Sequence, residues 1–164
     1  CAWCDLKESW DVDAHPRVEA GALVDEAVAS GAPICVITGG EPAMHDLVAL
    51  TAGLQDAGIR THIETSGTHP LTGAWDWVTF SPKRFKAPLD GIYARTDELK
   101  VIVVNRKDLE WGQAHAGKMS KGVRLYFQPE WDRRDQVLTY TVEYVQAHPE
   151  WRISLQTHKY LGLP

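Results

Sequence analysis

The stretch Ile34-Cys35-Val36-Ile37-Thr38-Gly39-Gly40-Glu41-Pro42 sets the pattern for the whole chain. Its first four residues predict a short buried strand, because they are apolar and mostly β-branched. The two glycines let the backbone turn and come close to a ligand, and proline suits the first position of a helix. The stretch therefore predicts either a plain strand-to-helix turn or a turn that holds a ligand beside the Glu41 carboxylate.

The same order of strand, turn and helix recurs along the sequence. Helical patterns are expected at residues 18–30, 45–57 and 132–147, and further strands at 61–64, 77–80, 99–104, 125–127 and 153–155. Asp132 is expected to cap the last of these helices. Alternating strands and helices predict an α/β fold in which right-handed crossovers join parallel strands.

Polar residues, glycine and proline gather directly after five of the predicted strands. The five clusters lie at residues 38–42, 64–68, 81–83, 128–130 and 156–159. Turns are often polar for conformational reasons alone. Parallel sheets and barrels, however, bind ligands at the carboxyl ends of their strands. We therefore expect the five clusters to contribute to a functional site.

Composition limits the classes of protein that fit this chain. It has 164 residues, of which 44% are hydrophobic and 24% charged. This length and composition predict a single globular domain over residues 1–164. No run reaches the roughly 18 apolar residues of a membrane span. The net charge of −5 argues against a nucleic-acid partner. Three cysteines in no disulfide-scaffold spacing fit a reducing cytoplasm.

The cysteines are the candidate metal ligands. Cys1 and Cys4 form a Cys-x-x-Cys pair, which suits an iron–sulfur cluster, half of a zinc site or a redox pair. Cys35 lies within an apolar strand and is expected to be a small core residue. Because residue 1 is not methionine, we expect the natural chain to begin upstream and to supply a third cluster ligand there. His115 is expected at the surface.

These motifs together resemble the radical S-adenosylmethionine enzymes. Cys1-Ala-Trp-Cys4-Asp5 and Gly39-Gly40-Glu41-Pro42 are typical of that superfamily. The rest of the chain is similar to one family within it, the 7-carboxy-7-deazaguanine synthases of queuosine biosynthesis. The matching segments are residues 7–11, 38–42, 64–67, 81–83, 98–100, 128–130 and, most specific to the family, 156–162.

The resemblance implies a partial parallel α/β barrel whose first strand and first cluster cysteine are missing from this chain. It implies a lyase that converts 6-carboxy-5,6,7,8-tetrahydropterin to 7-carboxy-7-deazaguanine with loss of ammonia. A reduced 4Fe–4S cluster would cleave S-adenosylmethionine, and the 5′-deoxyadenosyl radical would abstract a substrate hydrogen. The implied partners are the pterin substrate, a second copy of the chain and an electron donor such as flavodoxin.

The resemblance also implies the residues of the site. Cys1 and Cys4 would ligate the cluster, and Thr38, His158 and the carboxylate of Pro164 would contact the pterin. The S-adenosylmethionine site would contain Trp3, Cys4, Asp5, Gly40, Glu41, Ser81, Pro82, Lys83, Gln128, Pro129, Glu130 and Trp131.

One position departs from the family pattern. Leu6 stands where the family carries a threonine or serine whose oxygen helps to hold Mg²⁺. A leucine offers no oxygen to a hard cation, so Asp5, water and substrate would have to hold the ion, or a different metal relation applies. Two alternatives to the synthase remain: an activating enzyme that makes glycyl radicals on a partner protein, and a degenerate homologue without catalysis. The chain of residues 1–164 is itself expected to be inactive without its upstream segment.

Overall fold

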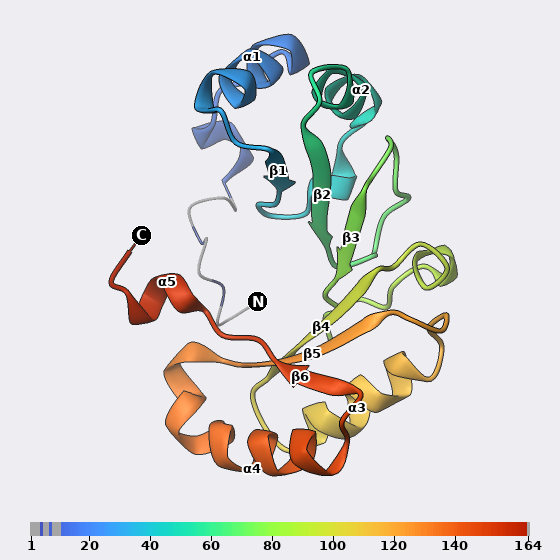
Figure 1. Cartoon of the computed structure of the whole chain (residues 1–164), viewed down its shortest axis with the longest axis vertical. Helices are drawn as coiled ribbons and strands as arrows, with labels where there is room; N and C mark the ends of the chain where they lie inside the picture. The colour runs from blue at the N-terminus through green and yellow to red at the C-terminus, as the bar shows by residue number, and fades with distance from the viewer. Residues whose placement is uncertain (1–3, 5–6, 8–10, 164) are drawn as a thin grey trace. The chain divides into compact units, whose positions relative to one another are not determined.

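A computed structural model describes Cys4, Lys7 and residues 11–163 of the chain. The chain divides into two compact units, Cys1–Arg95 and Thr96–Pro164 (Figure 1). Each unit contributes three strands that run parallel to their hydrogen-bonded neighbours. The prediction of an α/β fold with parallel strands is confirmed, whereas a single domain over residues 1–164 stays a prediction. No helix of the described part of the chain is long and apolar enough to cross a membrane.

The first unit places β2 between two parallel neighbours. Its elements are α1 (Ala20–Ser30), β1 (Ile34–Ile37), α2 (Val48–Asp56), β2 (Arg60–Thr65) and β3 (Trp77–Phe80). Ile37 of β1 pairs with Ile63 of β2, and Thr65 of β2 pairs with Phe80 of β3. The carboxyl ends of the three strands therefore lie next to one another, and the loops that follow them come together.

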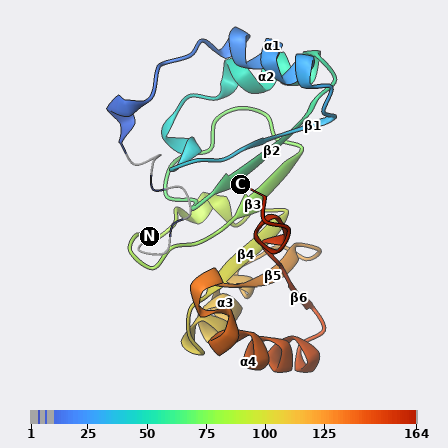
Figure 2. The same cartoon turned by 90° about the vertical axis from the view of Figure 1, so that its left-hand side faces the viewer.

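The core of this unit lies between α2 and the strands. Leu54 of α2, Ile63 of β2 and Phe80 of β3 are fully buried. Helices α1 and α2 pack side by side (Figures 1 and 2). The predicted burial of residues 34–37 is wrong, since Ile34 is 44% and Val36 49% exposed. These side chains stay accessible because β1 pairs with β2 along one edge and the helix that precedes it in the sequence, α1, buries none of its residues.

The second unit repeats the arrangement with β5 in the middle. Its elements are β4 (Glu98–Val103), α3 (Lys107–Ala116), β5 (Arg124–Pro129), α4 (Arg134–Ala147), β6 (Trp151–Ile153) and α5 (Thr157–Tyr160). Strand β5 pairs in parallel with β4 and β6. Helices α3 and α4 lie on the same side of these strands (Figures 1 and 2). Phe127 of β5 and Trp151 of β6 are fully buried and stack with ring centroids 3.8 Å apart.

Helix α3 is absent from the sequence-based prediction for a physical reason. Its buried positions include Asp108, Gly112 and His115, so they show no apolar helical period. Gly112 leaves room for Phe127, whose ring would lie 2.5 Å from an added Cβ. The prediction that His115 lies at the surface is wrong, because the residue is only 7% exposed.

Candidate active site

The structure describes most of the predicted site residues. Those it describes are Thr38, Gly40, Glu41, Ser81, Pro82 and Lys83 in the first unit, Gln128, Pro129, Glu130, Trp131 and His158 in the second, and Cys4. Cys1, Trp3, Asp5, Leu6 and Pro164 lie outside the described residues.

The turn after β1 presents an exposed backbone. Thr38, Gly39 and Gly40 are exposed, and the space where a Cβ on Gly39 would lie is open. The turn leads into a one-turn 3-10 helix, Pro42–Met44, which begins at proline as the sequence predicts. The Glu41 carboxylate caps this helix, since its Oε1 accepts a hydrogen bond from the backbone N–H of Ala43 at 3.1 Å. A ligand can thus approach the backbone of residues 38–40 directly.

The same carboxylate joins the turn after β1 to the loop after β2. The Thr65 hydroxyl donates to Oε1 of Glu41 at 2.6 Å, and the backbone N–H of Ser66 donates to Oε2 at 2.8 Å. The Ser66 hydroxyl donates to Oε2 as well. Thr68 Oγ1 lies 2.9 Å from the Ser66 hydroxyl and extends the chain of hydroxyl groups. The sequence identified residues 64–67 as similar to the family, but it did not identify the two hydroxyl residues as partners of Glu41.

The loop after β3 lies next to the loop after β2. The backbone N–H of Ser81 donates to the carbonyl of Thr65 at 2.8 Å, which keeps the two loops adjacent. Ser81 and Pro82 are buried, and the Lys83 ammonium donates to the Ser81 hydroxyl at 2.7 Å. The first unit therefore brings together three of the predicted clusters, at residues 38–42, 64–68 and 81–83.

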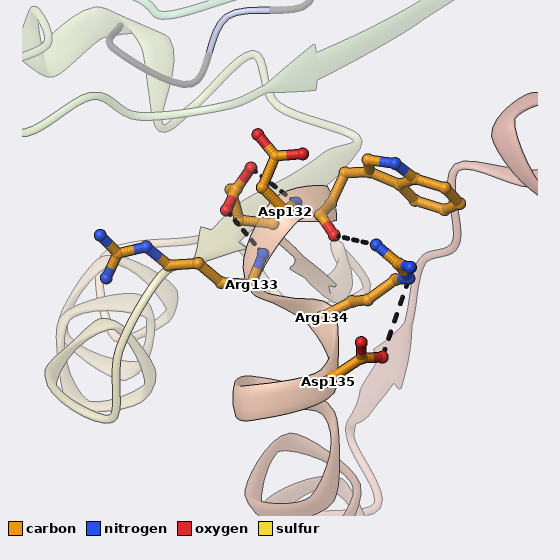
Figure 3. Close-up of polar contacts among 6 residues, drawn as sticks. Asp132, Arg133, Arg134 and Asp135 are labelled. Carbon is orange, nitrogen blue, oxygen red and sulfur yellow. Dashed lines mark hydrogen bonds and ion pairs between the residues drawn. The ribbon is translucent and has the colours of Figure 1, made fainter.

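In the second unit, Glu130 follows β5 and is only 6% exposed. Its two carboxylate oxygens accept hydrogen bonds from the backbone N–H groups of Asp132 and Arg133, each at 3.1 Å (Figure 3). Glu130 thus caps the 3-10 helix Trp131–Arg133, and α4 begins only at Arg134. The prediction that Asp132 caps this helix is wrong, because the longer carboxylate two residues earlier accepts both bonds. Gln128 contacts the end of β6, where the Ser154 hydroxyl donates to Oε1 at 3.4 Å.

Trp131 connects the loop after β5 to the C-terminal helix. The Arg134 guanidinium lies 4.4 Å from the indole centroid and donates to the Trp131 carbonyl at 2.7 Å. The Arg134 guanidinium also forms an ion pair with the Asp135 carboxylate at 3.8 Å. Figure 3 shows that the Arg133 side chain points away from Arg134. From α5, the Tyr160 ring meets the indole edge-on at 4.9 Å, and the Lys159 ammonium lies 5.4 Å from it. This cluster fixes the start of the tail.

The tail beyond α5 turns through a Schellman motif. The N–H of Gly162 donates to the carbonyl of Lys159 at 3.3 Å, and the N–H of Leu163 donates to that of His158 at 2.9 Å. Gly162 has φ +66°, a conformation that side chains with a Cβ rarely adopt. His158 is exposed on α5. The motif sets the direction in which the chain leaves Leu163.

The two cysteines that the structure describes, Cys4 and Cys35, differ in how well they could bind iron. Cys4 is a free, partly exposed thiol, so its thiolate is accessible to iron. Burial raises the pKa of the Cys35 thiol, which disfavours the thiolate that metal ligation needs. Among the residues that the structure describes, no three His, Cys, Asp or Glu side chains form a metal-binding group. The thiol chemistry therefore favours Cys4, the second cysteine of the Cys-x-x-Cys pair with Cys1, over Cys35 as a metal ligand.

Known proteins resemble the chain over nearly its whole length. The 7-carboxy-7-deazaguanine synthase of Synechocystis sp. is 47% identical over 163 residues, which cover 99% of this chain and 78% of that protein. The 7-carboxy-7-deazaguanine synthase of Flavobacterium psychrophilum is 43% identical over 164 residues, 100% of this chain and 78% of that protein. No protein-family model matches the chain.

A solved structure shares the fold. The crystal structure of QueE from Escherichia coli superimposes with a TM-score of 0.81 at 30% sequence identity. The similarity covers 95% of this chain and 79% of that one. With these identities and this coverage, the chain belongs to the 7-carboxy-7-deazaguanine synthase family.

Proposed function

We propose that this protein converts 6-carboxy-5,6,7,8-tetrahydropterin to 7-carboxy-7-deazaguanine with loss of ammonia, as a radical S-adenosylmethionine lyase of queuosine biosynthesis. Membership of the synthase family across 99% of the chain is the observation that carries this proposal. The hydrogen-bonded loops after β1, β2 and β3 support it, since a radical reaction needs its reactants held firmly and away from water.

Cys1 and Cys4 would hold a 4Fe–4S cluster together with a third cysteine from outside residues 1–164. When bound, the cluster and S-adenosylmethionine supply the radical that removes a substrate hydrogen. The residues of the chain would bind and orient. Gly40, Glu41, the loop after β3 (residues 81–83) and the residues 128–131 are the candidate contacts of S-adenosylmethionine.

The pterin would be recognised by groups that match its hydrogen-bonding edges. Thr38 is exposed beside the glycine turn and offers a hydroxyl. The Pro164 carboxylate would accept two hydrogen bonds from the donor edge of the ring, with His158 nearby. Mg²⁺ would have to be held without an oxygen from Leu6. We further propose a homodimer in the cytoplasm, reduced by an external donor such as flavodoxin.

Anaerobic reconstitution of the natural full-length protein and of residues 1–164 tests this function. Iron and sulfide are counted, and product is assayed with S-adenosylmethionine and the tetrahydropterin, with and without Mg²⁺. Cys4→Ala is the test variant. Cys35→Ala is its matched control, because it removes a thiol that the cluster would not use.

We expect about four irons per full-length chain, product from the full-length protein, loss of both in Cys4→Ala and retention of both in Cys35→Ala. We expect no product from residues 1–164 alone. A cluster without product would shift the assignment to another radical reaction. The absence of a cluster from every sample would leave a homologue that binds ligand without this chemistry.

A further inference from the structure

The loop after β3 continues into a short turn of basic residues, 83–86, which we call the basic turn. Lys83 and Lys86 form an isolated antiparallel bridge, so Arg84 and Phe85 lie at the tip between them. Three of the 17 lysine and arginine residues of the chain fall within these four positions, although the net charge of the chain is −5. Arg84, Phe85 and Lys86 are all exposed. The basic turn is thus a local patch of positive charge on an acidic chain.

Phe85 is the most exposed large apolar side chain in the described part of the chain, at 72%. Full burial of a phenylalanine side chain is worth about 1.5–3 kcal/mol, and a position at the tip of a turn forgoes this gain. Aromatic side chains and arginine are enriched where proteins bind one another. Phe85 beside Arg84 therefore has the chemistry of a protein-docking site.

The base of the basic turn is held on both sides. The backbone N–H of Leu89 donates to the carbonyl of Gly67 at 2.8 Å, and Ser81 donates to the same loop after β2. The Lys86 ammonium lies 3.1 Å from Nε2 of His69 and donates to it, because an ammonium has no acceptor. A proline stands before and after the turn and restricts the backbone there. A turn held in this way loses little conformational freedom when a partner binds to it.

The charge of the basic turn favours an acidic protein as its partner. Binding of a nucleic acid needs contacts to many phosphates and is opposed by the net charge of −5. An acidic protein surface needs only a small complementary patch, because opposite charges guide two proteins into a productive encounter. The proposed reaction requires such an encounter, since its cluster is reduced by a separate donor.

We propose that the basic turn is the docking site of an acidic electron-donor protein, with Phe85 as the apolar anchor and Arg84 and Lys86 as the charged contacts. This inference rests on the proposed function, in which Lys83 contacts S-adenosylmethionine. Arg84 and Phe85 follow Lys83 within two residues, or about 7 Å of chain. The donor passes one electron to the cluster and leaves oxidised by one electron, and no atom is transferred.

Docking is tested on the reconstituted full-length enzyme with reduced flavodoxin as the probe. The rate of product formation is measured against flavodoxin concentration, and again with dithionite, a small reductant that needs no docking site. We expect Phe85→Ala and Arg84→Glu/Lys86→Glu each to raise the flavodoxin concentration for half-maximal rate about tenfold. Phe85→Tyr should stay within about twofold of the wild type because it keeps the ring. All three variants should match the wild type with dithionite.

Lys118→Glu/Lys121→Glu is the matched control. Both lysines are exposed in the loop before β5, and the double substitution changes the net charge by the same amount. It should leave the half-maximal flavodoxin concentration unchanged, and an equal rise would contradict docking at the basic turn. Added salt should reduce the difference between the wild type and Arg84→Glu/Lys86→Glu, since salt screens exposed charges.

Two other partners are outcomes of the same set of variants. If Arg84→Glu/Lys86→Glu changes the oligomeric state in sedimentation, the basic turn contacts a second copy of the chain and the proposal is wrong. If this variant loses binding to polyuridylate while its rate with flavodoxin stays that of the wild type, the partner is a nucleic acid and the proposal is again wrong.

Failure of this inference and failure of the proposed function give different results. If the wild type makes product and the variants respond normally to flavodoxin, the docking site is wrong and the function stands. If no protein makes product with either reductant, the proposed function fails. Binding of flavodoxin to the immobilised wild type and variants, measured without turnover, then still decides the docking site.

Discussion

Glu41 follows β1 and Glu130 follows β5, and each carboxylate caps a one-turn 3-10 helix. Beyond this shared role the two regions differ. Glu41 accepts one hydrogen bond from the helix that it caps, from Ala43, and three from Thr65 and Ser66 at the end of β2. Glu130 accepts two hydrogen bonds, both from backbone N–H groups of the helix that it caps, those of Asp132 and Arg133.

The loop after β5 is instead connected through a ring. Trp131 contacts Arg134, the first residue of α4, and Tyr160 on the C-terminal helix. A carboxylate that joins two loops depends on a few directional hydrogen bonds. Ring contacts depend instead on the apolar area that is buried and on the polarised π face of the ring. The loop after β1 in the first unit and the loop after β5 in the second are thus ordered by different forces, and different substitutions should disturb them.

Trp131→Ala should have the largest effect on the second region. The edge contact with Tyr160 and the cation contacts with Arg134 and Lys159 are together worth about 2 kcal/mol, or about thirtyfold in the ordering of the tail. Trypsin cleavage after Lys159 in the full-length protein should accelerate accordingly. Trp131→Phe, which keeps an aromatic ring, should show a smaller acceleration. Equal cleavage in all three proteins would contradict the role of the ring.

Gly162→Ala should reduce the order of the same tail through backbone strain. The left-handed conformation costs a residue with a Cβ about 1–2 kcal/mol. With the tail contacting the pterin as proposed, loss of its order by this amount corresponds to a rise of about fivefold to thirtyfold in KM. Gly122→Ala is the matched control, because Gly122 also has positive φ (+94°) but lies before β5. A rise in KM with Gly122→Ala of the same size would show that strain anywhere produces the effect.

Glu130→Gln should cost about 1 kcal/mol, the usual contribution of a helix cap. Hydrogen exchange should rise at the amides of Asp132 and Arg133 and nowhere in the first unit. Denaturant unfolding gives the stability change, and exchange gives its extent. If exchange also rises at Ser66, the contrast between Glu130, which caps its own helix, and Glu41, which joins two loops, is wrong.

Asp76→Asn should have the smallest effect and the clearest pH dependence. Asp76 lies before β3, and the hydrogen bond from the backbone N–H of Thr61, at 2.8 Å, is the main cause that holds the pKa of this carboxyl below its usual range. The ionised carboxylate therefore stabilises the fold above the ordinary carboxyl pKa, and this contribution is lost as the pH falls through the lowered value.

Unfolding of wild type and Asp76→Asn is compared at neutral and acidic pH. The difference in free energy should be present at neutral pH and disappear at low pH. Binding of S-adenosylmethionine should be unchanged, because Asp76 ties the start of β2 rather than its carboxyl end. A difference that persists at low pH would assign the effect to packing instead of charge.

The sequence predicted the strands and the positions of the loops because their patterns are local. Apolar runs such as Val101 to Val103 indicate strands, and a glycine pair followed by Glu41 indicates a turn. The partners of Glu41 could not be predicted in the same way. Thr65 and Ser66 lie 24 and 25 residues along the chain, and only the parallel pairing of β1 with β2 brings them to the carboxylate.

Burial was harder to predict than secondary structure. Residues 34–37 have the composition of a core strand, yet Ile34 and Val36 are exposed because burial depends on what packs against a strand. Helix α3 shows the reverse, since its buried face carries Asp108 and His115. Asp108 is tolerated there because its Oδ2 accepts the N–H groups of Val104 and Asn105, each at 2.8 Å. Such satisfaction of a polar group is visible only in three dimensions.

A crystal structure of the full-length enzyme with S-adenosylmethionine tests the central claim most directly. The account predicts that the Glu41 carboxylate still accepts the hydrogen bonds of Thr65 and Ser66 when S-adenosylmethionine is bound. An ammonium bound to the Glu41 carboxylate, with those two hydroxyl groups turned away, would contradict it.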